Sequence, residues 1–152
     1  MHSEGQYAEE LAVLFPGTRL GWSDVLVEEG NTLTPEQIYP YMNGNFVFKH
    51  AVTRFPESIK EAFEKSGENL SDLKLFIPHQ ANLRISQFVQ RQLGLRDDQV
   101  FNNIQKYGNT TAASIPIALS EAHAEGSFQK GDLICMTAFG SGFTWGTVLM
   151  RW

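Results

Sequence analysis

The sequence contains a single cysteine, Cys135, among its 152 residues. One thiol cannot form an internal disulfide or supply a multi-cysteine metal site, so both are excluded. The histidines do not replace it, because His2, His50 and His123 have no carboxylate or cysteine at ligand spacing. We therefore assign no metal site, and this cysteine usage leads us to expect a cytoplasmic protein.

Basic residues are also scarce. Twelve lysines and arginines stand against 17 aspartates and glutamates, which gives a formal net charge of −5. A general nucleic-acid binder needs a basic face to neutralise phosphates, so this balance argues against one. No apolar run approaches the roughly 20 residues of a membrane helix, and the first five residues lack the basic-then-apolar order of a signal peptide. Eleven phenylalanines and three tryptophans instead supply one buried core.

Hydrophobic periodicity predicts an α/β fold with a mixed, largely buried sheet. Apolar residues at helical spacing predict a helix from residue 43 that Pro56 interrupts or restarts and Gly67 ends. The remaining predicted elements are short strands at 11–15 and 24–28 joined by a turn at Pro16–Gly17, a helix start at 34–37, a strand over 73–77, a helix over 81–93, a connecting stretch over 100–107, a helix through 115–122, and a terminal hairpin of 132–139 and 143–152.

Two loops with polar side chains precede predicted helices. His79 follows a buried strand, where functional residues of open α/β folds gather, and its Nε2 could donate a hydrogen bond. The alternative is a loop histidine that the backbone satisfies. In the second loop, small residues around Asn109 would let the backbone approach a ligand closely. The alternative there is a helix cap made by Asn109 or Thr110.

The third loop, 139–143, joins the strands of the terminal hairpin and contains two glycines. Such glycines usually supply positive φ angles in a tight turn. Alternatively, free backbone N–H groups of this loop hold an oxyanion. Cys135 lies nearby in sequence, but its neighbours Ile134 and Met136 are too apolar to favour a thiolate, so we predict a buried packing residue.

Taken together, the loops form an ordered set of motifs. The segments Pro78–Ile85, Tyr107–Pro116 and Ala138–Gly146, in this order, resemble the C-terminal half of β-ketoacyl-acyl-carrier-protein synthase III, and Met42–Lys49 is similar to another segment of that family. The resemblance places the C-terminal domain at 41–152. Residues 1–40 match weakly, as a segment joining from the other half.

The resemblance implies a thiolase-like half with a five-stranded mixed sheet covered by helices. It also implies an acyltransferase of fatty-acid or related polyketide-like biosynthesis. Such enzymes condense an acyl thioester with malonyl-acyl-carrier protein in a decarboxylative Claisen reaction, without a cofactor beyond their coenzyme A and carrier-protein thioester substrates. Acyl carrier protein and acyl-coenzyme A are the implied partners, and a homodimer is the implied assembly of the full enzyme.

The resemblance also assigns roles to residues. His79 and Asn109 correspond to the histidine and asparagine of a Cys-His-Asn set, whose two N–H donors would stabilise the enolate oxygen formed by decarboxylation. Asn82 corresponds to an asparagine that orders this region and the pantetheine arm, and Phe139 to an aromatic wall. The remaining assignments are Gly140, Ser141 and Gly142 for the oxyanion loop, Asn45 for substrate binding, and Lys49, Arg84 and Arg91 for carrier-protein docking or, equally, for solvated helix faces.

The nucleophilic cysteine of that family lies in the other half, and Cys135 is on the wrong strand to replace it. We therefore expect half an enzyme: a piece cut from a longer synthase, which the place of Met1 favours, or one part of a split or two-chain synthase. The chain alone should be inactive. The alternative function is a non-catalytic subunit that docks carrier protein or serves as a scaffold.

Overall fold

The computed structural model describes residues 1–13 and 39–152. The predicted strand at 24–28, the turn at Pro16–Gly17 and the helix start at 34–37 lie outside these ranges. The described helices and strands are β1 (His2–Ser3), β2 (Leu11–Ala12), β3 (Tyr41–Met42), α3 (Gly44–Ser66), β4 (Leu73–Pro78), α4 (Leu83–Leu93), α5 (Ile104–Tyr107), α6 (Ser114–Ala124), β5 (Leu133–Gly140) and β6 (Thr144–Arg151).

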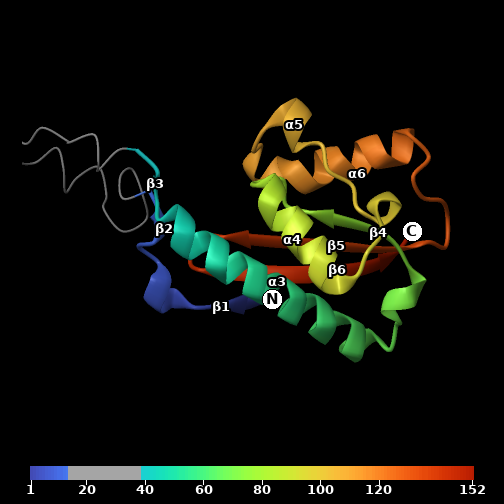
Figure 1. Cartoon of the computed structure of the whole chain (residues 1–152), viewed down its shortest axis with the longest axis horizontal. Helices are drawn as coiled ribbons and strands as arrows, with labels where there is room; N and C mark the ends of the chain where they lie inside the picture. Colours follow the sequence, from blue (N-terminus) through green and yellow to red (C-terminus); the bar gives the residue numbers. More distant parts are fainter. Residues whose placement is uncertain (14–38) are drawn as a thin grey trace, which may run out of the picture.

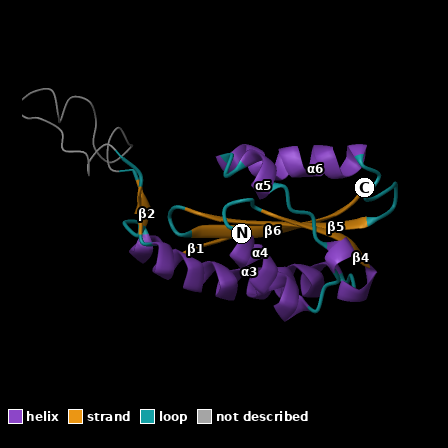
Figure 2. Cartoon of the chain, turned by 45° about the horizontal axis from the view of Figure 1, so that its top comes forward, coloured by secondary structure: helices purple, strands orange, loops and turns teal. Residues whose placement is uncertain are grey.

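The sheet lies between two layers of helices, with α3 and α4 on one face and α6 on the other (Figure 1, Figure 2). Its strand order is β1-β6-β5-β4. Strands β4 and β5 are parallel, whereas β5 and β6 form an antiparallel hairpin and β1 pairs antiparallel with β6. The α/β class and the mixed sheet are therefore confirmed. Strands β2 and β3 form a separate pair.

The sheet has four strands in the described ranges, and the prediction of five was wrong for them. Val100 forms one isolated parallel bridge with Phe76 of β4, at the place where a further strand would lie. The N–H of Phe101 still donates to the Phe76 carbonyl oxygen at 3.0 Å. The ladder does not continue beyond it, because the N–H groups of Asn103 and Ile104 donate to the side chain of Gln80 instead. A strand needs consecutive backbone pairs, and this segment has only one.

Helix α3 is continuous through Pro56, so the prediction that Pro56 interrupts or restarts it was wrong. A proline inside a helix costs about 3 kcal/mol, because it removes one hydrogen bond and crowds the preceding turn. Beyond it, however, Ile59 and Phe63 continue the buried face of the helix. Each contributes about 1.5–3 kcal/mol by burial. Together they offset the cost, and the helix runs on to Gly67, the expected end, with a φ of 72°.

Helix α4 begins at Leu83, two residues later than predicted, because Asn82 lies outside the helix as its cap. The Asn82 Oδ1 accepts a hydrogen bond from the backbone N–H of Arg84 at 2.9 Å. This bond satisfies one of the donors that a helix start leaves free. Asn82 is three residues beyond His79, so the same residue ends the turn that carries His79 and caps the start of α4.

The core has two parts, one on each face of the sheet. Between the sheet and the helices α3 and α4 lie fully buried side chains such as Phe76, Cys135 and Phe143. The other part, under α6, includes Ile77 and Ile134. Alternate residues of β4 and β5 thus point to opposite faces, both of which are covered. Of the helices in the described ranges, none is long and apolar enough to cross a membrane.

Candidate active site

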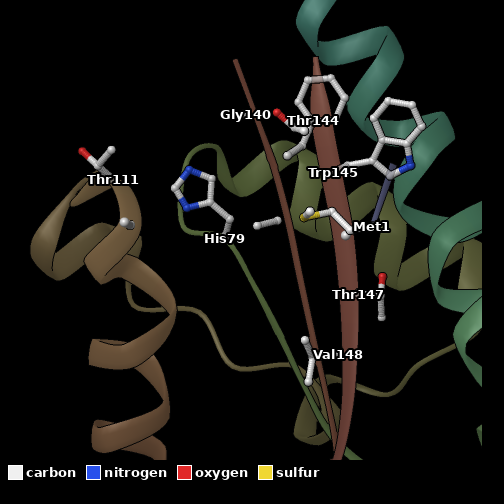
Figure 3. A pocket seen from close by; sticks show the side chains of 12 residues that line it. Met1, His79, Thr111, Gly140, Thr144, Trp145, Thr147 and Val148 are labelled. Carbon is white, nitrogen blue, oxygen red and sulfur yellow. The ribbon is translucent and has the colours of Figure 1, made fainter. Parts of the chain in front are cut away.

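An apolar pocket of about 480 Å³ lies where β4 and β5 end and α6 begins (Figure 3). Residues from all three predicted loops line it. His79 comes from the first loop, Thr111 and Ala112 from the second, and Phe139 and Gly140 from the third. In Figure 3 His79 lies between Thr111 and the two strands of the hairpin. The other lining residues are Met1, Ala138, Thr144, Trp145, Gly146, Thr147 and Val148.

His79 is held at both its backbone and its ring. Its backbone N–H donates to the carbonyl oxygen of Thr137 on β5 at 2.8 Å, a bond of the last parallel pair, Pro78 with Thr137. Its ring Nδ1 lies 2.5 Å from the hydroxyl oxygen of Ser114, the first residue of α6. Burial lowers the pKa of His79 below its usual 6.5, because the charged form loses solvation. The imidazole is therefore neutral at pH 7 and can offer one N–H donor.

Gln80, a residue that the sequence did not single out, fixes the turn that carries His79. Its side chain is buried, and its Nε2 donates to the carbonyl oxygen of Pro78 at 2.7 Å. Its Oε1 accepts from the backbone N–H groups of Asn103 and Ile104 at 3.0 and 3.2 Å. One amide thus joins the end of β4 to the segment before α5. In the sequence, only its position next to His79 indicates that Gln80 is important for the site.

Asn109 lies near the pocket in sequence but not in its lining. Its side chain is exposed, and its Oδ1 accepts from the backbone N–H of Thr111 at 2.9 Å. Thr111 has a φ of 54°, in the left-handed region that a non-glycine residue rarely adopts. The hydrogen bond from Thr111 to Asn109 thus stabilises the start of the short helical turn 111–113. The amide nitrogen of Asn109 donates to no residue in the part of the chain that the structure describes.

The third loop contributes its first residues to the pocket. The Phe139 ring is buried, lies 4.8 Å from the Phe143 ring between centroids, and is stacked on Trp145 at 6.1 Å. Ser141 is exposed and lies outside the lining, as does Gly142. Gly142 has a φ of 132°, and a Cβ atom there would lie 2.6 Å from the Thr144 hydroxyl oxygen. Only glycine fits this position, which agrees with the turn interpretation.

The other predicted site residues lie apart from the pocket. Asn82 caps α4, and Asn45 is exposed in the first turn of α3. Lys49, Arg84 and Arg91 are exposed on α3 and α4, which cover the same face of the sheet (Figure 2). Within residues 1–13 and 39–152, none of these three cations forms an ion pair.

Cys135 is fully buried in the core, and burial raises the pKa of its thiol to about 12. It is a packing residue, as the flanking apolar residues predicted. In the described ranges, no group of three or more histidine, cysteine, aspartate or glutamate side chains could hold a metal ion.

Comparison with known proteins gives the family. Residues 63–152 match the family model described as 3-oxoacyl-(acyl-carrier-protein) synthase III C terminal. A beta-ketoacyl-acyl-carrier-protein synthase III of Roseiflexus sp. is 43% identical over 150 residues, which are 99% of this chain and 44% of that protein. One from Aquifex aeolicus is 52% identical over 114 residues, which are 75% of this chain and 37% of that protein.

The fold leads to the same relatives. A crystal structure of the synthase III from Thermus thermophilus superposes with a TM-score of 0.85 at 38% identity, over 99% of this chain and 44% of that one. The structure from Aquifex aeolicus gives a TM-score of 0.81 at 42% identity, over 99% of this chain and 42% of that one. The chain thus spans less than half the length of these relatives, and it belongs to the 3-oxoacyl-(acyl-carrier-protein) synthase III C-terminal family.

Proposed function

We propose that this chain is the C-terminal catalytic half of a β-ketoacyl-acyl-carrier-protein synthase. It would serve the decarboxylative condensation of an acyl thioester with malonyl-acyl-carrier protein. The observation that carries the proposal is His79, a neutral histidine held at the edge of an apolar pocket where all three motif loops meet. A neutral imidazole at a developing negative charge acts as a hydrogen-bond donor, as this reaction needs.

The chemistry follows from the charge that forms. Loss of CO2 from a malonyl thioester leaves an enolate, whose oxygen carries the developing charge. The Nε2–H of His79 and the amide N–H of Asn109 would donate to that oxygen. The exposed amide of Asn109 would turn toward the oxygen when substrate fills the pocket. The Ser141 backbone N–H, beside Gly140 and Gly142, would serve the earlier acyl-transfer step. No cofactor is needed, because the thioester substrates supply the reacting groups.

The nucleophile would come from elsewhere, because the single thiol of the chain is buried and stays protonated at neutral pH. With a pKa raised to about 12, Cys135 holds almost no thiolate at neutral pH, and it is closed off from solvent. We therefore propose that an amino-terminal half supplies the cysteine and that the chain alone is inactive. Mass spectrometry of the chain after incubation with acyl-coenzyme A should show no acyl adduct. An adduct on Cys135 would contradict this proposal.

The donor pair is tested in a complete synthase formed by this chain and a cysteine-bearing amino-terminal half. Losing one hydrogen-bond donor to a developing oxyanion costs on the order of a hundred- to a thousand-fold in rate. His79→Ala and Asn109→Ala should each slow malonyl decarboxylation by this amount, and the double variant by less than the product. His123→Ala, at the far end of α6, is the control. Near wild-type decarboxylation in both single variants would refute the assignment.

Acyl carrier protein and acyl-coenzyme A are the proposed partners, and a homodimer in the cytoplasm the proposed assembly and location. Lys49, Arg84 and Arg91 are exposed and form no ion pair with the described residues, which favours carrier-protein docking, because acidic partners are steered by such cations. The same observation supports the alternative, a docking subunit without turnover. Glutamate at all three positions should weaken carrier-protein binding in both cases. Only the catalytic proposal also predicts that His79→Ala slows product formation by about a hundred- to a thousand-fold while carrier-protein binding persists.

A further inference from the structure

We infer that Ser114 is a positioning residue that fixes the tautomer of His79, with the proton on Nε2 and none on Nδ1. Its consequence for catalysis rests on the function proposed above, whereas the tautomer itself does not. The inference comes from the hydrogen bonds of one buried hydroxyl group, which joins the first residue of α6 to the turn after β4.

The Ser114 side chain is 2% exposed, so its hydroxyl group must find its partners within the protein. In the described part of the chain its oxygen has two partners. It accepts from the backbone N–H of Gln80 at 3.3 Å, and it lies 2.5 Å from Nδ1 of His79. The first bond has a fixed direction, because a backbone amide can only donate.

The direction of the second bond follows from the hydroxyl hydrogen. A serine hydroxyl has one hydrogen to donate and two lone pairs to accept with. If Nδ1 carried a proton, the Ser114 oxygen would accept from both partners and its own hydrogen would have no acceptor. Buried polar hydrogens are rarely left in that state. The hydroxyl of Ser114 therefore donates to Nδ1, and the neutral ring of His79 carries its proton on Nε2.

This arrangement places the donor where the pocket is. Within the described ranges, Nε2 of His79 has no hydrogen-bond partner, and the ring lines the pocket between Thr111 and Gly140 (Figure 3). Because Nδ1 is occupied by Ser114, the ring cannot rotate without breaking that bond. Ser114 thus fixes both the orientation of the imidazole and the atom that donates into the pocket.

The test uses the 152-residue chain labelled with ¹⁵N-histidine, at a pH where the rings are neutral. Long-range ¹H–¹⁵N correlation spectra distinguish a proton on Nε2 from one on Nδ1, and His79→Gln assigns the signal among the four histidines. In the wild-type chain we expect His79 almost entirely as the Nε2–H form. A proton on Nδ1 in the wild-type chain would overturn the inference, whatever the variants do.

Ser114→Ala removes the hydroxyl donor and should lower the preference for Nε2–H by roughly fivefold or more, the lower end of what an unpaired buried group costs. Ser114→Thr keeps the hydroxyl and should restore the preference. The matched control is Ser86→Ala, since Ser86 is also a buried helical serine, and its hydroxyl has no partner in the part of the chain described. An unchanged tautomer in folded Ser114→Ala would refute the inference.

The complete synthase gives a second readout. Ser114→Ala should lower kcat for decarboxylation with little change in KM, and Ser114→Thr should recover it. If the tautomer behaves as expected but His79→Ala leaves decarboxylation unchanged, the proposed function fails and the role of Ser114 in fixing the ring stands. If His79 is essential but its proton lies on Nδ1, the inference about Ser114 fails and the proposed function stands.

Discussion

Replacing Gln80 by leucine should destabilise the turn after β4 more than any surface substitution. Leucine has a similar size and fills the same buried space, so the change removes hydrogen bonds without opening a large cavity. It leaves four backbone groups without their Gln80 partner: the carbonyl oxygens of Pro78 and Phe101 and the N–H groups of Asn103 and Ile104. Asn103 is only 4% exposed, so water cannot replace the lost bond at its N–H.

The magnitude follows from the burial of these groups. An unsatisfied buried donor or acceptor costs about 1–3 kcal/mol. Two of the four groups, the Pro78 oxygen and the Asn103 N–H, belong to buried residues. Phe101 and Ile104 are half-buried, so their groups can recover water. The free energy of unfolding should therefore fall by about 2–5 kcal/mol. Because the buried leucine side chain itself contributes favourably, the expected loss is closer to about 2 than to about 5 kcal/mol.

Amide hydrogen exchange measures the effect locally. In Gln80→Leu the amides of Asn103 and Ile104 should exchange roughly 5- to 150-fold faster, the rate equivalent of 1–3 kcal/mol per amide. Urea unfolding gives the global loss. Gln87→Leu, an exposed position on α4, is the control and should change stability by less than about 0.5 kcal/mol. Wild-type exchange at both amides in a folded Gln80→Leu chain would refute the reasoning.

Three further predictions concern the core, the hairpin and the histidine. The Cys135 thiol, whose pKa is about 12, should resist iodoacetamide until the chain unfolds; rapid alkylation of the folded chain would contradict its burial. Gly142→Ala should lower the free energy of unfolding by about 1–3 kcal/mol, because the new Cβ would clash with Thr144 and a φ of 132° strains alanine. Gly5→Ala, where the new Cβ meets open space, should leave the free energy of unfolding unchanged. Because burial lowers the pKa of His79, the unfolded chain binds more protons below about pH 6.5, so stability should fall as pH drops from there toward the folded pKa. His79→Gln should remove part of that loss in urea titrations, and an identical pH dependence would count against the lowered pKa.

The parts of the fold that sequence predicts well are those set by local chemistry. Asn43 caps the start of α3, and Gly67, in the left-handed conformation, ends the helix. The apolar neighbours of Cys135 correctly indicate that it is buried. Pro56 misled the prediction because proline acts locally, whereas the packing that outweighs it acts over the whole helix. The absence of a fifth strand beside β4 in the described part of the chain has the same origin, since the Gln80 side chain accepts hydrogen bonds from the backbone of the segment that would have formed it.

For the site, the sequence identified the loops but not what holds them. His79 and Phe139 lie in the pocket as the motifs indicate, whereas Asn82 and Asn45 lie at helix starts outside it. The sequence marks Ser114 only as a member of the second motif, because its contact with His79 joins residues 35 apart in the chain. Sequence periodicity reports which side of a helix is buried. It does not report which polar groups meet across a tertiary contact.

The convergence of the three loops is a consequence of topology. Strands β4 and β5 are parallel, with Pro78 beside Thr137, so the loops that follow them lie at the same edge of the sheet. The chain must return to the opposite edge before β5 can start, and α6 makes that return. Its first residue therefore lies at the edge where the strands end. A motif at the start of α6 meets the motifs after β4 and β5 for this reason, and a hydrogen bond from Ser114 to His79 becomes geometrically available.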